Sequence, residues 1–110
     1  MGILRAIVEW RRPQAWKQAS QKCKQDHPVC QFCGLARDLE AHDVLPYHLW
    51  PNPKSVTYQE WYANMITLCR MKGWGCHILH GHCGDPDGLR YNPQIRQQAD
   101  AAEPFTRYCK

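Results

Sequence analysis

The sequence predicts a single small α+β domain, and three observations lead to this expectation. The chain has 110 residues, enough for one domain with a thin apolar core. A stretch of good helix formers precedes two short strand-like stretches, and a second helical stretch follows them. Two closely spaced pairs of cysteines are placed to join these pieces. We therefore expect one domain over residues 1–110, with a basic helix at about 13–25, a core at about 27–84 and a tail at 85–110.

The first predicted element is a helix of about three turns at residues 13–25. Pro13 suits the first helical turn, and good helix formers follow it. We expect His27 and Pro28 to end this helix, because proline cannot continue it. His27 then lies at its C-terminal end.

A tight turn and a strand come next. In residues 29–34 two backbone amides can point at the sulfurs of Cys30 and Cys33. Residues 39–45 alternate enough to predict a strand, which Pro46 closes.

The second half of the core repeats this order. Residues 46–63 contain three prolines and several aromatic residues, which predicts a long connection with some local order. Residues 65–69 predict a second strand. Residues 76–82 predict a short helix that presents histidines, and the tail allows a helix at about 93–102.

The cysteines carry the clearest chemical signal. Two pairs of thiols about 35 residues apart match the ligand set of one tetrahedral zinc ion. Such an ion would join the two halves of the core. The predicted zinc ligands are Cys30, Cys33, Cys69 and Cys76. An alternative is that His77 or His82 takes the place of Cys76.

The cysteine count also bears on the compartment. Seven cysteines are an odd number, which argues against a closed disulfide framework and favours a reducing, cytoplasmic setting. No stretch of 18 apolar residues is present, and we find no secretory signal, so we expect no membrane span. The thiols left over by the zinc site are Cys23, Cys83 and Cys109.

Positive charge is concentrated in the first quarter of the chain. The formal net charge of +4 is only mild evidence for an anionic partner. The early cations form a denser group, which predicts contact with nucleic acid, although an ordinary solvated helix face is an equal alternative. The candidate nucleic-acid-binding residues are Arg11, Arg12, Lys17, Lys22 and Lys24.

Five segments in a fixed order carry a family resemblance. They are His27-Pro-Val-Cys-Gln-Phe-Cys-Gly34, Ala41-His-Asp-Val-Leu-Pro-Tyr-His-Leu49, Asn64-Met-Ile-Thr-Leu-Cys69, Cys76-His-Ile-Leu-His-Gly-His82 and Tyr91-Asn-Pro93. In this order and spacing the chain resembles the HNH endonuclease family, in the zinc-bound form common in phage and bacterial genomes. The resemblance covers about residues 16–97. It implies a ββα-metal, treble-clef-like core stapled by the four-cysteine zinc.

The resemblance also implies a second divalent cation, which would be Mg2+, Mn2+, Ni2+ or Zn2+. His42 on the first strand, with His77 and His82 on the short helix, matches the family's metal-binding positions. His80 is a competing choice for the last ligand. Because His77 and His82 are five residues apart, we expect the helix to end or bend before His82. The histidines could alternatively hold a second structural metal.

Asp43 stands where the family has its general-base histidine. Three interpretations stay open. Asp43 could be the base if burial raises its pKa. It could instead join His42 as a metal ligand, while His48 or a metal-bound hydroxide takes the proton. Otherwise the site is catalytically impaired. Asn64 matches the middle residue of the family name, whose amide fixes the loop that carries the base.

The function implied by the resemblance is metal-dependent hydrolysis of DNA phosphodiesters, with nicking by a monomer and little sequence preference. One alternative is an impaired, zinc-stabilised domain that binds DNA or another protein. Another is a nuclease acting on RNA or branched DNA. The resemblance also implies a bacterial host cell, a phage-encoded origin and partners among phage packaging proteins.

Overall fold

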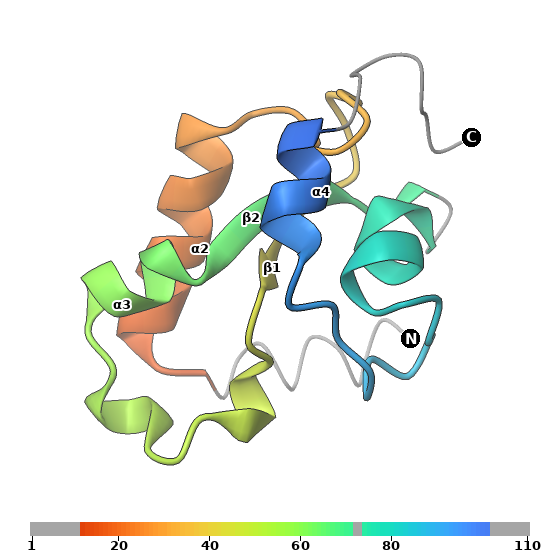
Figure 1. The fold of residues 1–110 in the computed structure, drawn as a ribbon. Helices are drawn as coiled ribbons and strands as arrows, with labels where there is room; N and C mark the ends of the chain where they lie inside the picture. Colours follow the sequence, from red (N-terminus) through yellow and green to blue (C-terminus); the bar gives the residue numbers. More distant parts are fainter. Residues whose placement is uncertain (1–11, 72–73, 102–110) are drawn as a thin grey trace.

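The computed structural model describes residues 12–71 and 74–101 of the chain. In Figure 1, α2 and α3 lie on one side of a central two-stranded sheet, and η4 and α4 lie on the other. No helix in the described ranges is long and apolar enough to cross a membrane. In chain order the elements are α2 (Gln14–Asp26), β1 (Leu39–Asp43), the 3₁₀ turns η1 (Tyr47–Leu49) and η2 (Pro53–Ser55), α3 (Tyr58–Ala63), β2 (Met65–Cys69), the π-helix η4 (His77–Gly81) and α4 (Ile95–Ala101).

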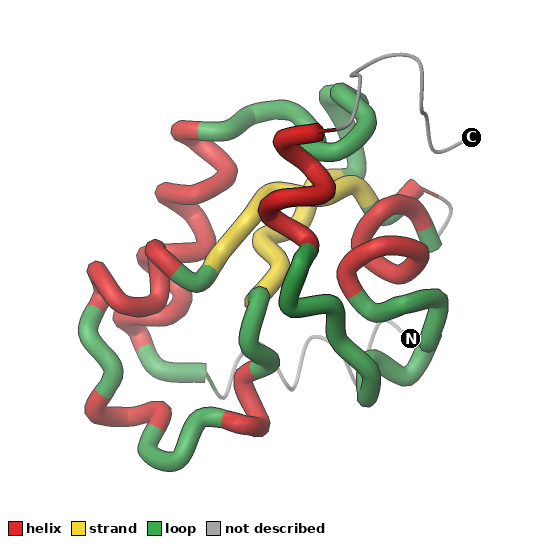
Figure 2. Tube along the Cα trace, viewed as in Figure 1, coloured by secondary structure: helices red, strands yellow, loops and turns green. Residues whose placement is uncertain are grey.

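The sheet separates the molecule into two sides. β1 and β2 are antiparallel, with His42 opposite Ile66 and Asp43 opposite Met65. Successive side chains of a strand point to opposite faces of a sheet. His42 therefore faces η4 and Asp43 faces α2, and Figure 2 shows the strands between these helical layers.

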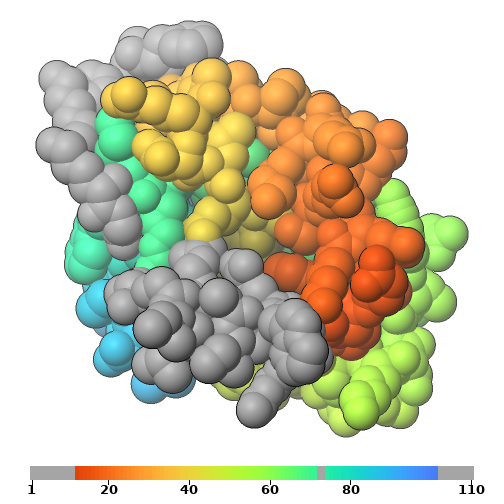
Figure 3. Space-filling model, turned by 180° about the vertical axis from the view of Figure 1, so that it is seen from behind, coloured from red at the N-terminus to blue at the C-terminus, as the bar shows by residue number. Residues whose placement is uncertain are grey.

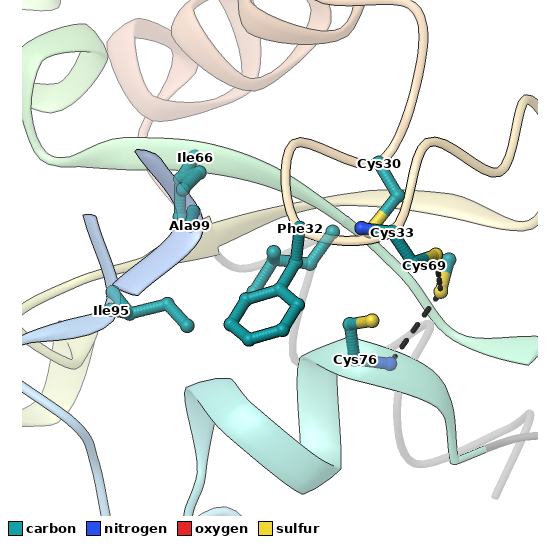
Figure 4. Close-up of a cluster of buried hydrophobic side chains, with 9 residues drawn as sticks. Cys30, Phe32, Cys33, Ile66, Cys69, Cys76, Ile95 and Ala99 are labelled. Atoms are coloured by element: carbon teal, nitrogen blue, oxygen red, sulfur yellow. Dashed lines mark hydrogen bonds between the residues drawn. The ribbon is translucent and has the colours of Figure 1, made fainter. Parts of the chain in front are cut away.

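A separate apolar cluster packs against each face of the sheet. On one face, Figure 4 shows Phe32 and Ile95 packed beside four converging cysteines. On the other face, Trp16 of α2 packs with Trp61 of α3 and Met65 of β2. Figure 3 shows the turn segment that carries the first cysteine pair, in yellow, between α2 in orange and the teal segment that contains η4.

Most predicted elements are present. The helix predicted at 13–25 is α2, and β2 matches its predicted bounds. The strand predicted at 39–45 ends at Asp43, because the amide of Leu45 donates to Asn64 Oδ1 at 2.9 Å. The tail helix is α4, slightly shorter than predicted. Together these elements form the expected small α+β fold.

One helix was missed. The connection predicted at 46–63 contains α3. Its N-terminus has a capping box, in which the hydroxyl of Thr57 accepts from the amide of Glu60 at 3.1 Å and Glu60 Oε1 accepts from the amide of Thr57 at 3.1 Å. The Thr-x-x-Glu spacing is visible in the sequence and predicts this helix start.

Candidate metal centre and adjoining cleft

Four buried thiols converge at the junction of the turn, β2 and η4. Their sulfur atoms lie within 4.8 Å of one another. The Sγ atoms of Cys33 and Cys69 are 3.7 Å apart, which matches the roughly 3.8 Å edge of a tetrahedron with Zn–S bonds of about 2.3 Å. The four cysteines are Cys30, Cys33, Cys69 and Cys76, each at most 2% exposed. This cluster is compatible with a structural metal such as zinc, and it contains Cys76 rather than a histidine.

Backbone groups around the sulfurs fit a thiolate site. The amide of Cys33 donates to Cys30 Sγ at 3.4 Å, and the amide of Cys76 donates to Cys69 Sγ at 3.5 Å. Gly75 makes the second contact possible. Its φ is +57°, and a Cβ there would lie 2.4 Å from the carbonyl oxygen of Cys69.

Three histidines form a second cluster, beside the first. His42 comes from β1, His77 from the start of η4 and His82 from the residue after it. One ring nitrogen from each lies within 4.8 Å of the others. His42 is 1% exposed, and both of its ring nitrogens are buried without a hydrogen-bond partner. A buried imidazole that lacks any partner is costly unless something absent from the polypeptide binds it.

The π-helix explains how the last two histidines meet. The amide of His82 donates to the carbonyl of His77 at 3.0 Å, which is the i to i+5 bond of a π-helix. Residues five apart therefore share a face here. The expectation that the helix ends before His82 is correct, but a bend is not needed. The widened turn itself aligns the two rings.

Hydrogen bonds on the far side of two rings fix where their lone pairs point. His82 Nδ1 lies 2.8 Å from the carbonyl oxygen of Arg90, and His77 Nδ1 lies 2.7 Å from Glu40 Oε1. A carbonyl and a carboxylate accept only, so both Nδ1 atoms carry protons. In the neutral form of each ring, Nε2 is then a bare lone pair, yet the two Nε2 atoms lie 3.1 Å apart. Two acceptors at that distance need a proton or a cation between them.

Burial holds two of these rings in the neutral state. It lowers the pKa of His42 well below the ordinary histidine value, with smaller contributions from His77 and His82. It also lowers the pKa of His82, although the Arg90 carbonyl opposes this. A neutral imidazole is the form that binds a metal ion.

Gly81 admits the His42 ring. A Cβ on Gly81 would lie 2.9 Å from Cε1 of His42 and 3.1 Å from each of its ring nitrogens. A larger residue would therefore displace the ring. His80, the competing ligand, lies outside this cluster and stacks on Phe32 at a centroid distance of 3.9 Å.

Asp43 lies on the opposite face of the sheet in a different environment. Its carboxylate accepts from Trp16 Nε1 at 2.9 and 3.2 Å, from Arg12 Nη1 at 2.9 Å and from Asn64 Nδ2 at 3.4 Å. Burial raises the pKa of Asp43, while the Trp16, Arg12 and Asn64 contacts oppose the rise. Asp43 is not among the clustered ligand atoms of His42. The geometry therefore does not make Asp43 a co-ligand of His42.

Asn64 fixes the chain that follows β1. Its Oδ1 accepts from the amide of Leu45 at 2.9 Å, and its Nδ2 donates to the Leu45 carbonyl at 3.0 Å. One side chain thus replaces the missing ladder bonds at the strand end. It also touches Asp43, so it connects the loop to that carboxylate.

A cleft of about 510 Å³ joins the two environments. His42, His77 and His82 line one part of it, and Asp43 with Arg12 another. Its other charged or titratable lining residues are Tyr47, His48, Arg70 and Asp87. Of the other predicted nucleic-acid-binding cations, the three that the structure describes do not line it. Lys22 pairs with Asp26 at 3.1 Å, Lys24 is exposed and Lys17 is half-buried. Arg11 and Cys109 lie outside the described residues.

Two contributors were missed. Glu40 holds His77, and its position two residues before His42 on the same strand predicts that it shares the His42 face. The other is the ring pair around Arg12, formed by Trp16 and Tyr47. No sequence spacing predicts that contact.

Comparison of the chain with protein-family models, with curated proteins and with solved structures finds no match in any of the three. The functional assignment therefore rests on the chemistry of the residues themselves.

Proposed function

We propose that this protein is a metal-dependent endonuclease of the HNH type, which hydrolyses DNA phosphodiesters with a divalent cation at His42, His77 and His82. In this proposal β1, β2 and η4 form the ββα-metal core. The observation that carries the proposal is the pair of facing Nε2 atoms, 3.1 Å apart, whose rings are both fixed from behind. The partnerless ring of His42 beside them supports the same reading.

The donor set fits such a cation. Three neutral imidazoles suit Zn2+ or Ni2+ better than Mg2+. Glu40 behind His77 and the Arg90 carbonyl behind His82 are the outer partners that orient metal-binding histidines. When bound, such an ion neutralises phosphate charge and stabilises the leaving oxygen.

A proton acceptor must also be within the cleft. His48 is exposed on η1 and lines the same cleft as the three histidines. Histidine is the side chain most often used as a general base. We therefore propose that His48 takes the proton of the attacking water. That Asp43 is the base stays a prediction, and we favour His48 because donors already occupy the Asp43 carboxylate.

The hydrogen bonds that the Asp43 carboxylate already accepts also favour a second candidate function, binding without cleavage. With a donor on each side, Asp43 has little capacity left to accept a proton. An impaired domain that binds nucleic acid without cutting it is therefore the alternative to hydrolysis. Both candidates predict metal binding, and only one predicts turnover.

Incubation of the zinc-loaded protein with supercoiled plasmid and Mn2+, Ni2+, Mg2+ or Zn2+ tests the proposal. We expect metal-dependent nicking that His42→Ala and His77→Ala abolish, and that His48→Ala reduces by about 10²- to 10⁴-fold, the contribution typical of a general base. Full activity in His48→Ala, with loss of activity in Asp43→Ala, would show that Asp43 and not His48 is the general base. Absence of nicking above the His42→Ala background would sink the nuclease proposal. Parallel reactions with RNA and branched DNA separate the substrate classes.

A further inference from the structure

Arg12 is fixed in the wall of the cleft by contacts on three sides. Its Nη1 donates to Asp43 Oδ2 at 2.9 Å. Its guanidinium carbon lies 4.4 Å from the ring centroid of Trp16 and 4.5 Å from that of Tyr47. Trp16 also donates to Asp43, so the carboxylate and one ring form a single support. The side chain of Arg12 is 20% exposed, so this long cation is largely immobilised.

The fixed guanidinium has a donor left over. Its Nε atom is buried and has no hydrogen-bond partner. A guanidinium presents its donors in a planar fork that matches the oxygens of carboxylate and phosphate groups. Asp43 occupies one part of this fork. Because Nε is closed to solvent, an oxyanion in the cleft would instead meet the charge and the exposed fifth of the Arg12 side chain.

The surroundings of Arg12 favour an anion. Arg12 and the three metal-site histidines line the same cleft, and Arg70 adds a second cation to its wall. Arg12 stands directly before α2, whose first turn contains no acidic residue and whose N-cap, Pro13, supplies no side-chain cap. The positive end of the α2 dipole thus adds to the charge of Arg12. Among the described residues, Arg12 forms its ion pair with Asp43 and not with Asp87, the other acid of the cleft.

We propose that Arg12 is a subsite for one phosphate group of the nucleic-acid backbone, and that Asp43 is the positioning residue that aims it. This inference rests on the proposed function, and it gives Asp43 a role that needs no proton transfer. Trp16 and Tyr47 hold the guanidinium plane, and Asp43 fixes its direction within that plane. The subsite recognises phosphate and not base, so it acts on all sequences alike.

Binding measurements separate this role from catalysis. Fluorescence anisotropy of a short labelled DNA duplex is measured with the zinc-loaded full chain and Ca2+ at several salt concentrations. Arg12→Ala should weaken binding by about 10- to 100-fold, the range for a lost hydrogen bond to a charged group. It should also reduce the slope of log affinity against log salt by about one phosphate contact. Arg12→Lys keeps the charge and loses the planar fork of donors. Its affinity should therefore lie between those of the parent and of Arg12→Ala. Lys24→Ala is the matched control, since it removes one exposed cation from α2, outside the cleft.

Asp43→Asn tests whether Asp43 acts on DNA binding through Arg12 and not only through the stability of the fold. It should weaken binding through Arg12, so the double variant Arg12→Ala/Asp43→Asn should bind no more weakly than Arg12→Ala. The double variant also leaves no unpaired buried charge, which protects the test against misfolding. Zinc content and thermal melting of each variant are measured alongside.

The outcomes of the two proposals are distinct. Affinity and salt slope in Arg12→Ala equal to those in Lys24→Ala would overturn the phosphate subsite, whether or not the parent nicks plasmid. Additive losses in the double variant would overturn the positioning role of Asp43. If the parent binds DNA in an Arg12-dependent way but does not nick plasmid, the phosphate subsite is supported and the nuclease proposal is rejected.

Discussion

The two clusters of metal-binding side chains differ in how completely the protein surrounds them. The four cysteines lie inside an apolar cluster with Phe32 and Ile95, and backbone amides donate to two of their sulfurs. The three histidines line an open cleft, and the partners of His77 and His82 lie behind the rings. A closed set of four ligands is typical of a structural metal, whereas an open set of three leaves positions for other ligands. Under the proposed function, the closed cysteine cluster is structural and the open histidine cluster binds the second cation.

The histidine cluster depends on the cysteine cluster for its position. Cys76 and His77 are consecutive, so a metal at the cysteines positions the first turn of the histidine helix. The histidines contribute nothing comparable to the cysteine cluster, which is built around Cys69 and the turn before β1. Loss of the first cluster should therefore abolish both, while loss of the second should spare the first.

The largest expected effect comes from breaking the cysteine cluster. Cys69→Ser should unfold the domain, because structural zinc contributes about 10–16 kcal/mol to small zinc domains, comparable to a whole folding free energy of about 5–15 kcal/mol. Circular dichroism and zinc content measure this. Cys83→Ser is the control, because Cys83 is exposed and outside the cluster. A folded, cooperative Cys69→Ser variant without zinc would contradict the structural role.

A second change should break only the histidine cluster. Gly81→Ala places a Cβ 2.9 Å from the His42 ring, so His42 must move away from its partners. We expect affinity for the second cation to fall by at least the roughly 10- to 100-fold that loss of an outer partner costs, with the zinc retained. Calorimetric titration with Mn2+ measures the affinity. Gly84→Ala has a positive φ of +81° but nothing within 4 Å, so it controls for general destabilisation at this turn. Equal Mn2+ affinity in both variants would mean that His42 is not a ligand.

A smaller effect is expected behind the histidines. Glu40→Gln preserves shape and removes the carboxylate that accepts from His77. Affinity for the second cation should fall by about 10- to 100-fold, which is usual for an outer partner of a ligand. The same titration measures it, and zinc content should not change. An unaltered affinity would show that the charge of Glu40 is not needed, since the amide oxygen of the substituted glutamine can still accept from His77.

The smallest effect lies outside both clusters and checks the packing of α2 on α3. Tyr62 donates to Asp26 at 2.7 Å, which raises the pKa of Tyr62 to about 12. The folded pKa is above the unfolded value of about 10, so this contribution is present below pH 10 and is lost as pH rises through 12. Asp26→Asn should lower the pKa toward 10, as read by ultraviolet titration. The cation affinity should stay constant, and a change would reveal coupling between distant sites.

The sequence predicts the parts of the molecule that depend on local spacing. Cysteine pairs, strand alternation and the run of helix formers in α2 are all local patterns, and the structure contains each of them. The facing of His77 and His82 is not predictable from the usual helical repeat of 3.6, because the π-turn changes that repeat. The surroundings of Asp43 were also beyond prediction. They depend on Arg12 and Trp16, about 30 residues earlier in the chain, and only packing brings these together.

The central claim is that the histidine cluster holds a cation separate from the zinc, and metal stoichiometry tests it most directly. The zinc-loaded protein is equilibrated with Mn2+ or Ni2+, and both metals are counted per chain in the parent and in His77→Ala. We predict one zinc in both proteins and one further ion in the parent alone. A parent that keeps its zinc and takes up no second ion, or a His77→Ala variant that takes up as much as the parent, would contradict the claim.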